Sequence, residues 1–241
     1  MENNIEFISL YNELDAAIEE KYERYEEDSS IYFLINKFRK SNSSLENEYS
    51  KKLDSIRKIR NLYVHESGII DTLFYVSDDV IDTLKEILNY VIHPLRAKDV
   101  MTPFKKIKLA TLDSNVLELI GVIYNDGISN IPIINSDKAI IGIFNSDVLL
   151  NLVFHNIKID RETKIEEIKD EITFNANFNT RFIFVNENYE IDVLSEHFNR
   201  SKELYKKRLP LIFVTSTGKR TGALKGIIAP IDLIKNSVDK D

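Results

Sequence analysis

The sequence contains no cysteine and no tryptophan, and all of its prolines lie from residue 94 onward. The lack of cysteine excludes disulfide bonds and thiolate zinc sites, and it fits a reducing compartment. The chain has neither an apolar run of transmembrane length nor a signal peptide, so we expect a cytoplasmic protein without membrane association. No metal site is expected, because the histidines are scattered without metal-ligand spacing: His65, His93, His155 and His197.

The net charge of −7 argues against a general nucleic-acid-binding protein, because such proteins carry an excess of basic residues. Residues 51–60 nevertheless form a basic run in which Asp54 is the only acid: Lys51, Lys52, Arg57, Lys58 and Arg60. Such a run suits a phosphate-binding surface, and its candidate RNA contacts are Lys51, Arg57 and Lys58. A run of like charge is as often a solvated helix face, and both interpretations stay open at this point.

Glycine and proline divide the chain into two parts. Gly68 is the only glycine before Pro94, and the other six glycines follow it. The first 95 residues therefore predict an all-α bundle with short loops, and residues 96–241 predict a module of strands and helices. The expected helices of the bundle span residues 5–27, 31–39, 44–66 and 78–91, with Gly68 ending the third. The fold class predicted for the whole chain is α+β.

Arg60, Asn61 and His65 lie late in the third expected helix. Helical geometry places Arg57, Asn61 and His65 on one face, with Arg60 beside them. A separate apolar stripe is expected to face the core: Tyr49, Leu53, Ile56, Ile59 and Tyr63. Arginine binds phosphate oxygens through its fork of donors, and histidine exchanges protons near neutral pH. These residues suit RNA cleavage by the neighbouring 2′-hydroxyl, although solvated or capping side chains would produce the same pattern.

The Arg60-Asn61-Leu62-Tyr63-Val64-His65 segment resembles the Arg-polar-x3–5-His motif of the HEPN family of helical domains, in which three to five residues separate the polar residue from the histidine. The resemblance implies a metal-independent endoribonuclease that needs no catalytic cofactor. It also implies a homodimer in which two copies of the motif border one cleft. Arg60 would bind the scissile phosphate, His65 would act as the general acid or base, and Asn61 would orient His65 or the phosphate.

The second part of the chain contains an internal repeat. Ile131-Pro132-Ile133-Ile134 and Ile140-Ile141-Gly142-Ile143-Phe144 predict two short buried strands. The pattern returns at Leu209-Pro210-Leu211-Ile212-Phe213-Val214 and Leu224-Lys225-Gly226-Ile227-Ile228. Each copy is preceded by an expected helix, at 116–125 and 191–206, and is followed by another, at 147–154 and 230–237. The module is therefore a duplicated β-α-β-β-α unit.

This arrangement resembles a pair of CBS domains, with the repeats at residues 96–158 and 159–241. Asp99-Val100-Met101-Thr102-Pro103 looks like the first strand of the first repeat. The resemblance implies an adenine nucleotide such as AMP, ADP, ATP or cyclic di-AMP as a regulatory ligand, held in clefts between the repeats. The family pattern Gly-x-x-Ser/Thr-x-x-Asp places a phosphate-binding hydroxyl and a ribose-binding carboxylate after the last strand.

Neither repeat matches the CBS pattern completely. Gly226 and Asp232 have the expected spacing in the second repeat, but Ala229 replaces the hydroxyl residue. In the first repeat Ser146 and Asp147 follow Gly142 with one residue too few, and they could cap the helix instead. The candidate ligand-binding residues are Thr102, Asn145, Ser146, Asp147, Ala229 and Asp232.

The two resemblances together suggest a ribonuclease controlled by nucleotide binding, in a role such as stress response or phage defence. The alternative is a non-enzymatic nucleotide sensor whose helical domain serves dimerisation or the docking of a partner. Retention of the Arg60, Asn61 and His65 motif favours the enzyme.

Overall fold

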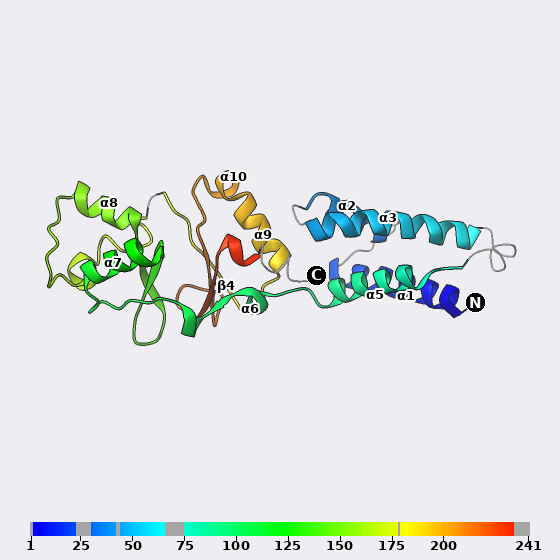
Figure 1. The fold of residues 1–241 in the computed structure, drawn as a ribbon, viewed down its shortest axis with the longest axis horizontal. Helices are drawn as coiled ribbons and strands as arrows, with labels where there is room; N and C mark the ends of the chain where they lie inside the picture. The colour runs from blue at the N-terminus through cyan, green and yellow to red at the C-terminus, as the bar shows by residue number, and fades with distance from the viewer. Residues whose placement is uncertain (1, 23–29, 42–43, 66–74, 178, 234–241) are drawn as a thin grey trace. The chain divides into compact units, whose positions relative to one another are not determined.

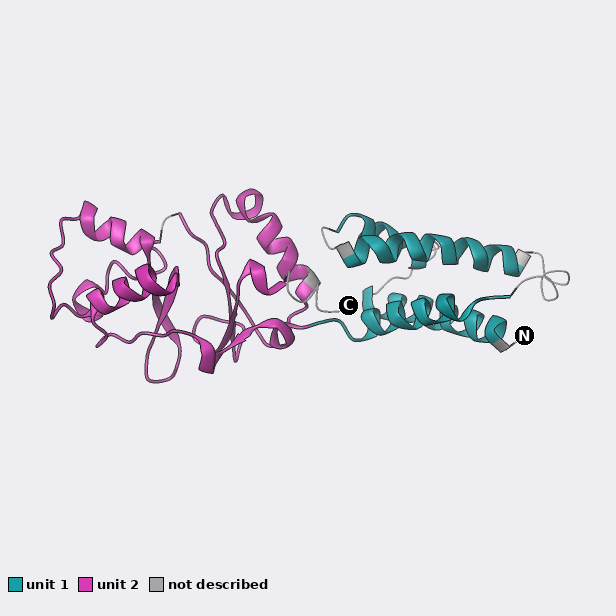
Figure 2. Ribbon diagram, viewed as in Figure 1, with its two compact units in different colours: residues 1–95 teal, residues 96–241 magenta. Residues whose placement is uncertain are grey.

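The computed structural model describes residues 2–22, 30–41, 44–65, 75–177 and 179–233. The chain divides into two compact units, Met1–Leu95 and Arg96–Asp241, which Figure 2 distinguishes by colour. Within the described residues the first unit is helical, and the second mixes strands with helices. The protein is therefore of mixed α and β structure, with an N-terminal helical region followed by a sheet-containing module.

The helical unit contains α1 (Glu2–Tyr22), α2 (Ser30–Arg39), α3 (Ser44–His65) and α5 (Asp78–Ile92). Helix α1 packs along α5, and α2 packs along α3, so that two helix pairs form two layers (Figure 1). These helices correspond to the four that the sequence predicts. Residues 23–27 of the first expected helix, Glu66 of the third and Gly68 lie outside the described residues.

The core of the helical unit collects the apolar stripes of its helices. On α3, Tyr49, Leu53 and Ile56 are buried, and Ile59 packs against them while partly exposed. The stripe predicted for this helix is confirmed at these positions. The Tyr49 hydroxyl donates a hydrogen bond of 2.7 Å to Oε1 of Glu86 on α5, which gives the phenol a partner inside the bundle. Burial, followed by the effect of Glu86, raises the pKa of Tyr49 above its usual value.

The second unit contains two antiparallel strand pairs of the predicted kind. Strand β2 (Asn130–Ile134) pairs with β3 (Ile140–Asn145), and β5 (Ile212–Thr215) pairs with β6 (Leu224–Ile228). A larger sheet has the order β1-β6-β5-β4, in which β1 (Thr102–Pro103) is antiparallel to β6 and β4 (Ile183–Val185) is parallel to β5. The described residues of the second unit also form seven short or medium helices: α6 (Ala97–Val100), η1 (Phe104–Lys106), α7 (Val116–Asp126), α8 (Ser146–Phe154), η2 (Ile165–Ile168), α9 (Ile191–Asn199) and α10 (Ser201–Tyr205).

The two repeats exchange their opening segments. Thr102 from the start of the module pairs with Ile227 in β6 of the second repeat. In the reverse direction, the backbone N–H of Ile143 in β3 donates a hydrogen bond of 2.9 Å to the carbonyl oxygen of Ile172. The apolar clusters follow the same exchange, because Ile172 packs with the first repeat and Val100 packs with the second. Each repeat is therefore completed by a segment that is distant in sequence.

A glycine lies at each of the two places where a strand of one repeat approaches the backbone of the segment that completes it. We call these places the crossing points. A Cβ atom at Gly142 would lie 2.6 Å from the Ile172 carbonyl oxygen. A Cβ atom at Gly226 would lie 2.9 Å from the carbonyl oxygen of Thr102, and it would also collide with the Met101 side chain. Such separations are far below van der Waals contact. The close approach of two backbones therefore requires both glycines of the repeated pattern.

The structure corrects three expectations about local elements. Residues 99–100 belong to α6 rather than to a strand, because Oδ2 of Asp99 accepts a 2.8 Å hydrogen bond from the Arg96 N–H and so caps a helical turn. The helix expected over 191–206 is divided at Arg200 into α9 and α10. The strand expected from Leu209 begins at Ile212, after Pro210, which has no N–H to donate to a neighbouring strand.

Candidate functional site

Arg60 and Asn61 lie on α3, and both are half-buried. The Arg60 guanidinium lies over the Tyr11 ring of α1, 5.4 Å from the ring centroid. Its charge also acts on Asp15 of α1, where it opposes the rise in the Asp15 pKa that burial causes. The structure therefore directs the Arg60 side chain toward α1. His65 is the last residue of α3, and its side chain lies outside the described part of the chain.

The basic run on α3 is partly neutralised by its own helix. Arg57 and Lys58 both bind the Asp54 carboxylate, at 3.2 Å and 2.9 Å, and these contacts lower the pKa of Asp54, with Lys58 having the larger effect. Lys52 pairs with Glu48 at 2.6 Å. The Arg57 guanidinium lies 5.7 Å from the centroid of the Tyr32 ring of α2. Acidic side chains of the same helix therefore neutralise part of the positive charge of the run. This arrangement is typical of a solvated helix face and less so of a phosphate-binding surface.

The candidate ligand residues fall into two groups, one at the end of each repeat's last strand. Thr102 lies beside β6 through its pairing with Ile227, two residues before Ala229. Oδ2 of Asp232 accepts a 2.8 Å hydrogen bond from the Ala229 N–H. The structure thus brings Thr102, Ala229 and Asp232 to one end of β6, where the Asp232 carboxylate caps the turn that follows the strand.

In the first repeat Asn145 caps the helix that closes the repeat. Its Oδ1 accepts a 3.2 Å hydrogen bond from the Val148 N–H at the start of α8, and its Nδ2 donates to Oδ1 of Asn177 at 2.8 Å. Asn145 is therefore the capping residue, a role that the sequence suggested for Ser146 or Asp147. Ser146 is exposed at the first position of α8.

Asp147 is buried and bound to the second repeat. It is 4% exposed, and its Oδ2 accepts a 2.6 Å hydrogen bond from the hydroxyl of Thr180, which is 6% exposed. The Arg208 guanidinium lies 3.9 Å from Oδ1 of Asp147. The first-repeat group therefore forms a buried polar cluster that joins the repeats, with Arg208 at its solvent side.

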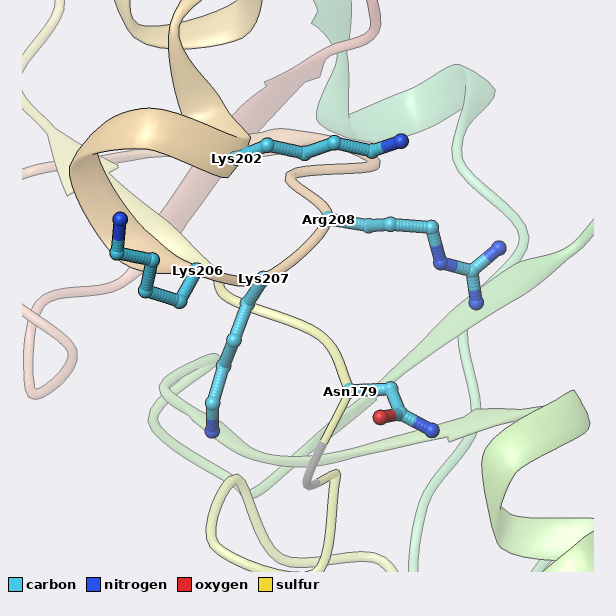
Figure 3. A pocket seen from close by; sticks show the side chains of 5 residues that line it. All are labelled: Asn179, Lys202, Lys206, Lys207 and Arg208. Carbon is cyan, nitrogen blue, oxygen red and sulfur yellow. The ribbon is translucent and has the colours of Figure 1, made fainter.

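Next to this cluster is a cavity of about 460 Å³ lined by Asn179, Lys202, Lys206, Lys207 and Arg208. Hydrogen bonds from the Arg208 N–H to the Asn179 carbonyl, at 3.1 Å, and from the Arg181 N–H to the Arg208 carbonyl, at 2.7 Å, hold its two walls together. Figure 3 shows Lys202, Arg208 and Asn179 extending to the same side, with Lys207 descending beside them and Lys206 turning away. We call this feature the basic cavity.

None of the residues that line the basic cavity is among the site residues predicted from the sequence. The available signal was the Lys206-Lys207-Arg208 run directly before the Leu209-Pro210 pattern, with Lys202 one helical turn earlier. The helix expected over 191–206 includes Lys202 and Lys206 and ends before Lys207 and Arg208. The left-handed backbone of Lys206, at φ 54°, ends α10 and turns the following residues toward Asn179. The pairing of this segment with residues 179–181 is a tertiary contact that local sequence does not encode.

Comparison with known proteins agrees with the resemblance of the second unit. Residues 97–155 match the CBS domain family model, so this part of the chain is a CBS domain. No curated protein matches the chain. Among described residues, no group of acidic, histidine or cysteine side chains is arranged to hold a metal ion, and none of the described helices is long and apolar enough to span a membrane.

Several solved structures are similar to this chain at low identity. A hemolysin-like protein containing a CBS domain, from Oenococcus oeni PSU, is 18% identical with a TM-score of 0.41, over 60% of this chain and 91% of that chain. CBSX2 in complex with AMP is 15% identical with a TM-score of 0.44, over 59% and 96% of the two chains. CbpB in complex with c-di-AMP is 16% identical with a TM-score of 0.45, over 63% and 89%.

Proposed function

We propose that residues 96–241 form a CBS-type pair that binds an adenine nucleotide and acts as a regulatory module. The CBS match at residues 97–155 carries this proposal. The repetition of the same architecture in the second half supports it, because Gly226 meets the Thr102 backbone as Gly142 meets that of Ile172. The helical unit then serves dimerisation or the docking of a partner, and the protein is a sensor rather than an enzyme.

The ligand site proposed for the second repeat lies at the end of β6. The Asp232 carboxylate, which already accepts the Ala229 N–H, is chemically suited to accept hydrogen bonds from a ribose diol. Thr102 contributes a hydroxyl from the paired strand β1. The first-repeat group, Asn145, Ser146 and Asp147, is the weaker candidate, because Asp147 is bonded to Thr180 and Asn145 to Asn177.

Calorimetric titration of the full chain with AMP, ADP, ATP and cyclic di-AMP tests the proposal. AMP and cyclic di-AMP are included because they are the ligands named for two of the similar solved structures. We expect at least one of the four to bind, and to bind more weakly to Asp232→Ala than to the control Asp126→Ala. Asp126 is an exposed acid at the end of α7, so the control removes the same charge elsewhere. Absence of binding by all four nucleotides contradicts the proposal.

The ribonuclease hypothesis stays a prediction of the Arg60, Asn61 and His65 motif. The contact of Arg60 with the Tyr11 ring and the pairing of Arg57 with Asp54 provide structural roles for both arginines, and they favour the sensor over the enzyme. A homodimer also stays a prediction for the helical unit. Sedimentation analysis of the full chain tests it, with a dimer expected and a monomer at micromolar concentration as the contrary result.

A further inference from the structure

The two layers of the helical unit carry opposite charge. Among the described side chains that reach the surface, the layer of α1 and α5 has nine acids against two cations, Lys21 and Lys85. The acids are Glu6, Glu13, Asp15, Glu19, Glu20, Asp78, Asp79, Asp82 and Glu86. The layer of α2 and α3, with Lys40 directly after α2, has eight cations against two acids, Glu48 and Asp54. The cations are Lys37, Arg39, Lys40, Lys51, Lys52, Arg57, Lys58 and Arg60. We call these surfaces the acidic layer and the basic layer.

Ion pairs within each layer neutralise only part of its charge. Lys85 pairs with Glu6 at 2.6 Å on the acidic layer, whereas the two acids of the basic layer bind three of its eight cations. Arg39, Lys40 and Lys51 are exposed, and they have no carboxylate partner within the described part of the chain. Like charges held on one surface repel one another, so each layer favours contact with a surface of the opposite charge.

The two charged surfaces lie on opposite sides of the helical unit and have similar dimensions. Helices α1 and α5 form one side, and α2 and α3 form the other (Figure 1). The long helices, α1 with 21 residues and α3 with 22, each extend over about 30 Å at ~1.5 Å per residue. Two neighbouring helices are about 20 Å across, so each side covers at most roughly 600 Å². This is less than the ~800 Å² that each partner buries in a standard complex, so a contact through these layers should be weak and reversible.

We propose that the acidic layer of one chain docks on the basic layer of a second copy of the chain. Charge complementarity selects this partner, because residues 96–241 are nearly balanced, with 20 acidic and 21 basic residues. Exposed apolar side chains lie on both layers, Ile5 on α1 and Tyr32 on α2, and they add to the area that docking removes from water. The proposal rests on the interaction role proposed for the helical unit, and it does not involve the nucleotide site.

The position of the two layers determines the form of the assembly. Because they lie on opposite sides of the unit, a copy that docks through its acidic layer keeps its basic layer available. Such a heterologous contact adds further copies unless the rotation between them closes a ring. The assembly should therefore grow beyond a dimer as the protein concentration rises, unlike the homodimer with a shared cleft that the HEPN resemblance implies.

Sedimentation velocity of the full chain, over a series of protein concentrations and at two salt concentrations, tests the contact. We expect the mean sedimentation coefficient to rise with protein concentration at about 0.05 M salt and this rise to disappear at about 0.5 M salt, because salt screens exposed charges. A species of the same size at both salt concentrations overturns the proposal, whether that species is a monomer or a dimer.

Charge reversal on each layer provides a pair of variants that can rescue each other. The basic-layer variant is Arg39→Glu with Lys40→Glu and Lys51→Glu, and the acidic-layer variant is Glu13→Lys with Glu20→Lys and Asp82→Lys; all six positions are exposed. Each variant alone should associate at least about tenfold more weakly than the wild type at low salt, because both of its layers then carry like charge. An equimolar mixture of the two should associate again, because each variant then meets the opposite charge.

The matched control reverses three exposed charges in the second unit: Lys98→Glu, Lys108→Glu and Lys158→Glu. The control should associate as the wild type does. An equal loss of association in the control and the basic-layer variant, or a mixture of the two layer variants that stays dissociated, overturns the proposal.

The outcomes separate this proposal from the proposed function. Association that salt abolishes and the mixture restores supports the contact even if no adenine nucleotide binds the chain. Nucleotide binding by a chain that does not associate at low salt overturns the contact and leaves the nucleotide sensor in place. If that chain instead binds a labelled single-stranded RNA, and the basic-layer variant does not, the basic layer is a nucleic-acid surface and the contact is likewise overturned.

Discussion

The Thr180 hydroxyl donates a hydrogen bond of 2.6 Å to Oδ2 of Asp147, and both side chains are buried. Asp147 lies in the first turn of the helix that closes the first repeat, whereas Thr180 precedes β4 in the second. This bond therefore joins the repeats through a group that the CBS resemblance would assign to a ligand. A buried carboxylate that loses its partner is costly, so the bond should contribute to stability in the absence of any ligand.

Replacement of Thr180 by valine tests this structural role. Valine keeps the shape of threonine and removes only the hydroxyl, which leaves Oδ2 of Asp147 without its donor. We expect a loss of about 1–3 kcal/mol in the free energy of unfolding, measured by urea denaturation of the full chain. Thr221→Val, at an exposed position, is the control and should change the free energy by less than about 0.5 kcal/mol. Equal free energies of unfolding for the two variants would show that the hydrogen bond from Thr180 to Asp147 does not stabilise the fold.

The glycines at the crossing points allow a second test of how the repeats are joined. In Gly142→Ala the new methyl group would lie 2.6 Å from the Ile172 carbonyl oxygen, so one backbone segment must shift. We expect destabilisation of about 1–3 kcal/mol, the usual range for overpacking. Gly121→Ala is the control. A Cβ atom at Gly121 would lie 3.8 Å from Nδ2 of Asn125, which is an ordinary van der Waals contact, and alanine has a higher helix propensity than glycine within α7. The control should be neutral or slightly stabilised, and a destabilised control would refute the argument.

Local sequence predicted the elements but not how the repeats complete each other. The apolar spacing on α3 predicted burial of Tyr49, Leu53 and Ile56, because helical periodicity alone places them on one face. The exchange of Thr102 and Ile172 between repeats was not predicted, since it depends on pairing between segments far apart in the chain. The two glycines of the repeated pattern mark the crossing points, but their neighbours are known only from the fold.

The candidate site was predicted only in part, because some of its residues are brought together by contacts between segments far apart in the chain. The repeated pattern identified the ends of β3 and β6, and the structure places Thr102 beside the strand that leads to Ala229 and Asp232. The basic cavity was not predicted, because its cations come from α10 and the turn after it, whereas its other wall comes from Asn179. The expected phosphate surface on α3 was a pattern of charge alone, and pattern does not reveal that Asp54 binds two of those cations.

Tyr49 should make the helical unit sensitive to alkaline pH. Burial and the bond to Glu86 raise its pKa in the folded chain, so the folded state holds this proton more tightly than the unfolded state. The resulting stability is fully present below the unfolded pKa of about 10 and is lost as pH rises above it. Tyr49→Phe should therefore reduce the alkaline fall in the free energy of unfolding, measured by urea denaturation between neutral and alkaline pH. Tyr124→Phe, at a residue 87% exposed, should leave that fall unchanged.

The ribonuclease hypothesis makes a separate chemical prediction. An active HEPN-type enzyme should cleave labelled RNA in the presence of EDTA and leave 2′,3′-cyclic phosphate and 5′-hydroxyl ends. His65→Ala should lower the rate by about 10²–10⁴, as expected for a general acid or base. Arg60→Lys should be nearly as damaging, because a point ammonium does not reproduce the guanidinium fork. Cleavage that requires magnesium, or that leaves 3′-hydroxyl ends, rejects this mechanism.

Arg60 needs a second measurement, because the structure also provides it with a packing role. Its guanidinium lies over the Tyr11 ring, so Arg60→Ala should lower stability by about 0.5–1 kcal/mol whether or not the chain is an enzyme. Thermal unfolding of Arg60→Lys and Arg60→Ala, compared with their RNA cleavage, separates the two roles. Loss of cleavage in proportion to the unfolded fraction would make Arg60 a structural residue.

Asp232 has two functions that a pair of substitutions can separate. Its carboxylate caps the turn after β6 through the Ala229 N–H, and the proposed function assigns it the ribose hydroxyls. Asp232→Asn keeps an oxygen acceptor for the cap but has lost the charge and the second acceptor that bind a diol. Asp232→Ala removes both functions. We therefore expect both variants to weaken nucleotide binding at least about tenfold, and only Asp232→Ala to lose stability, by roughly 1 kcal/mol.

Calorimetry and thermal unfolding on the same samples decide between the two functions. The nucleotide for the titration is whichever of AMP, ADP, ATP and cyclic di-AMP binds the wild type most tightly. Asp126→Ala controls for the general loss of an acidic charge, because Asp126 is an exposed acid at the end of α7. If Asp232→Asn binds the nucleotide as tightly as the wild type, the carboxylate is a helix cap alone. The nucleoside would then have to be recognised elsewhere, and the first-repeat group at Asn145 and Asp147 would become the site to test.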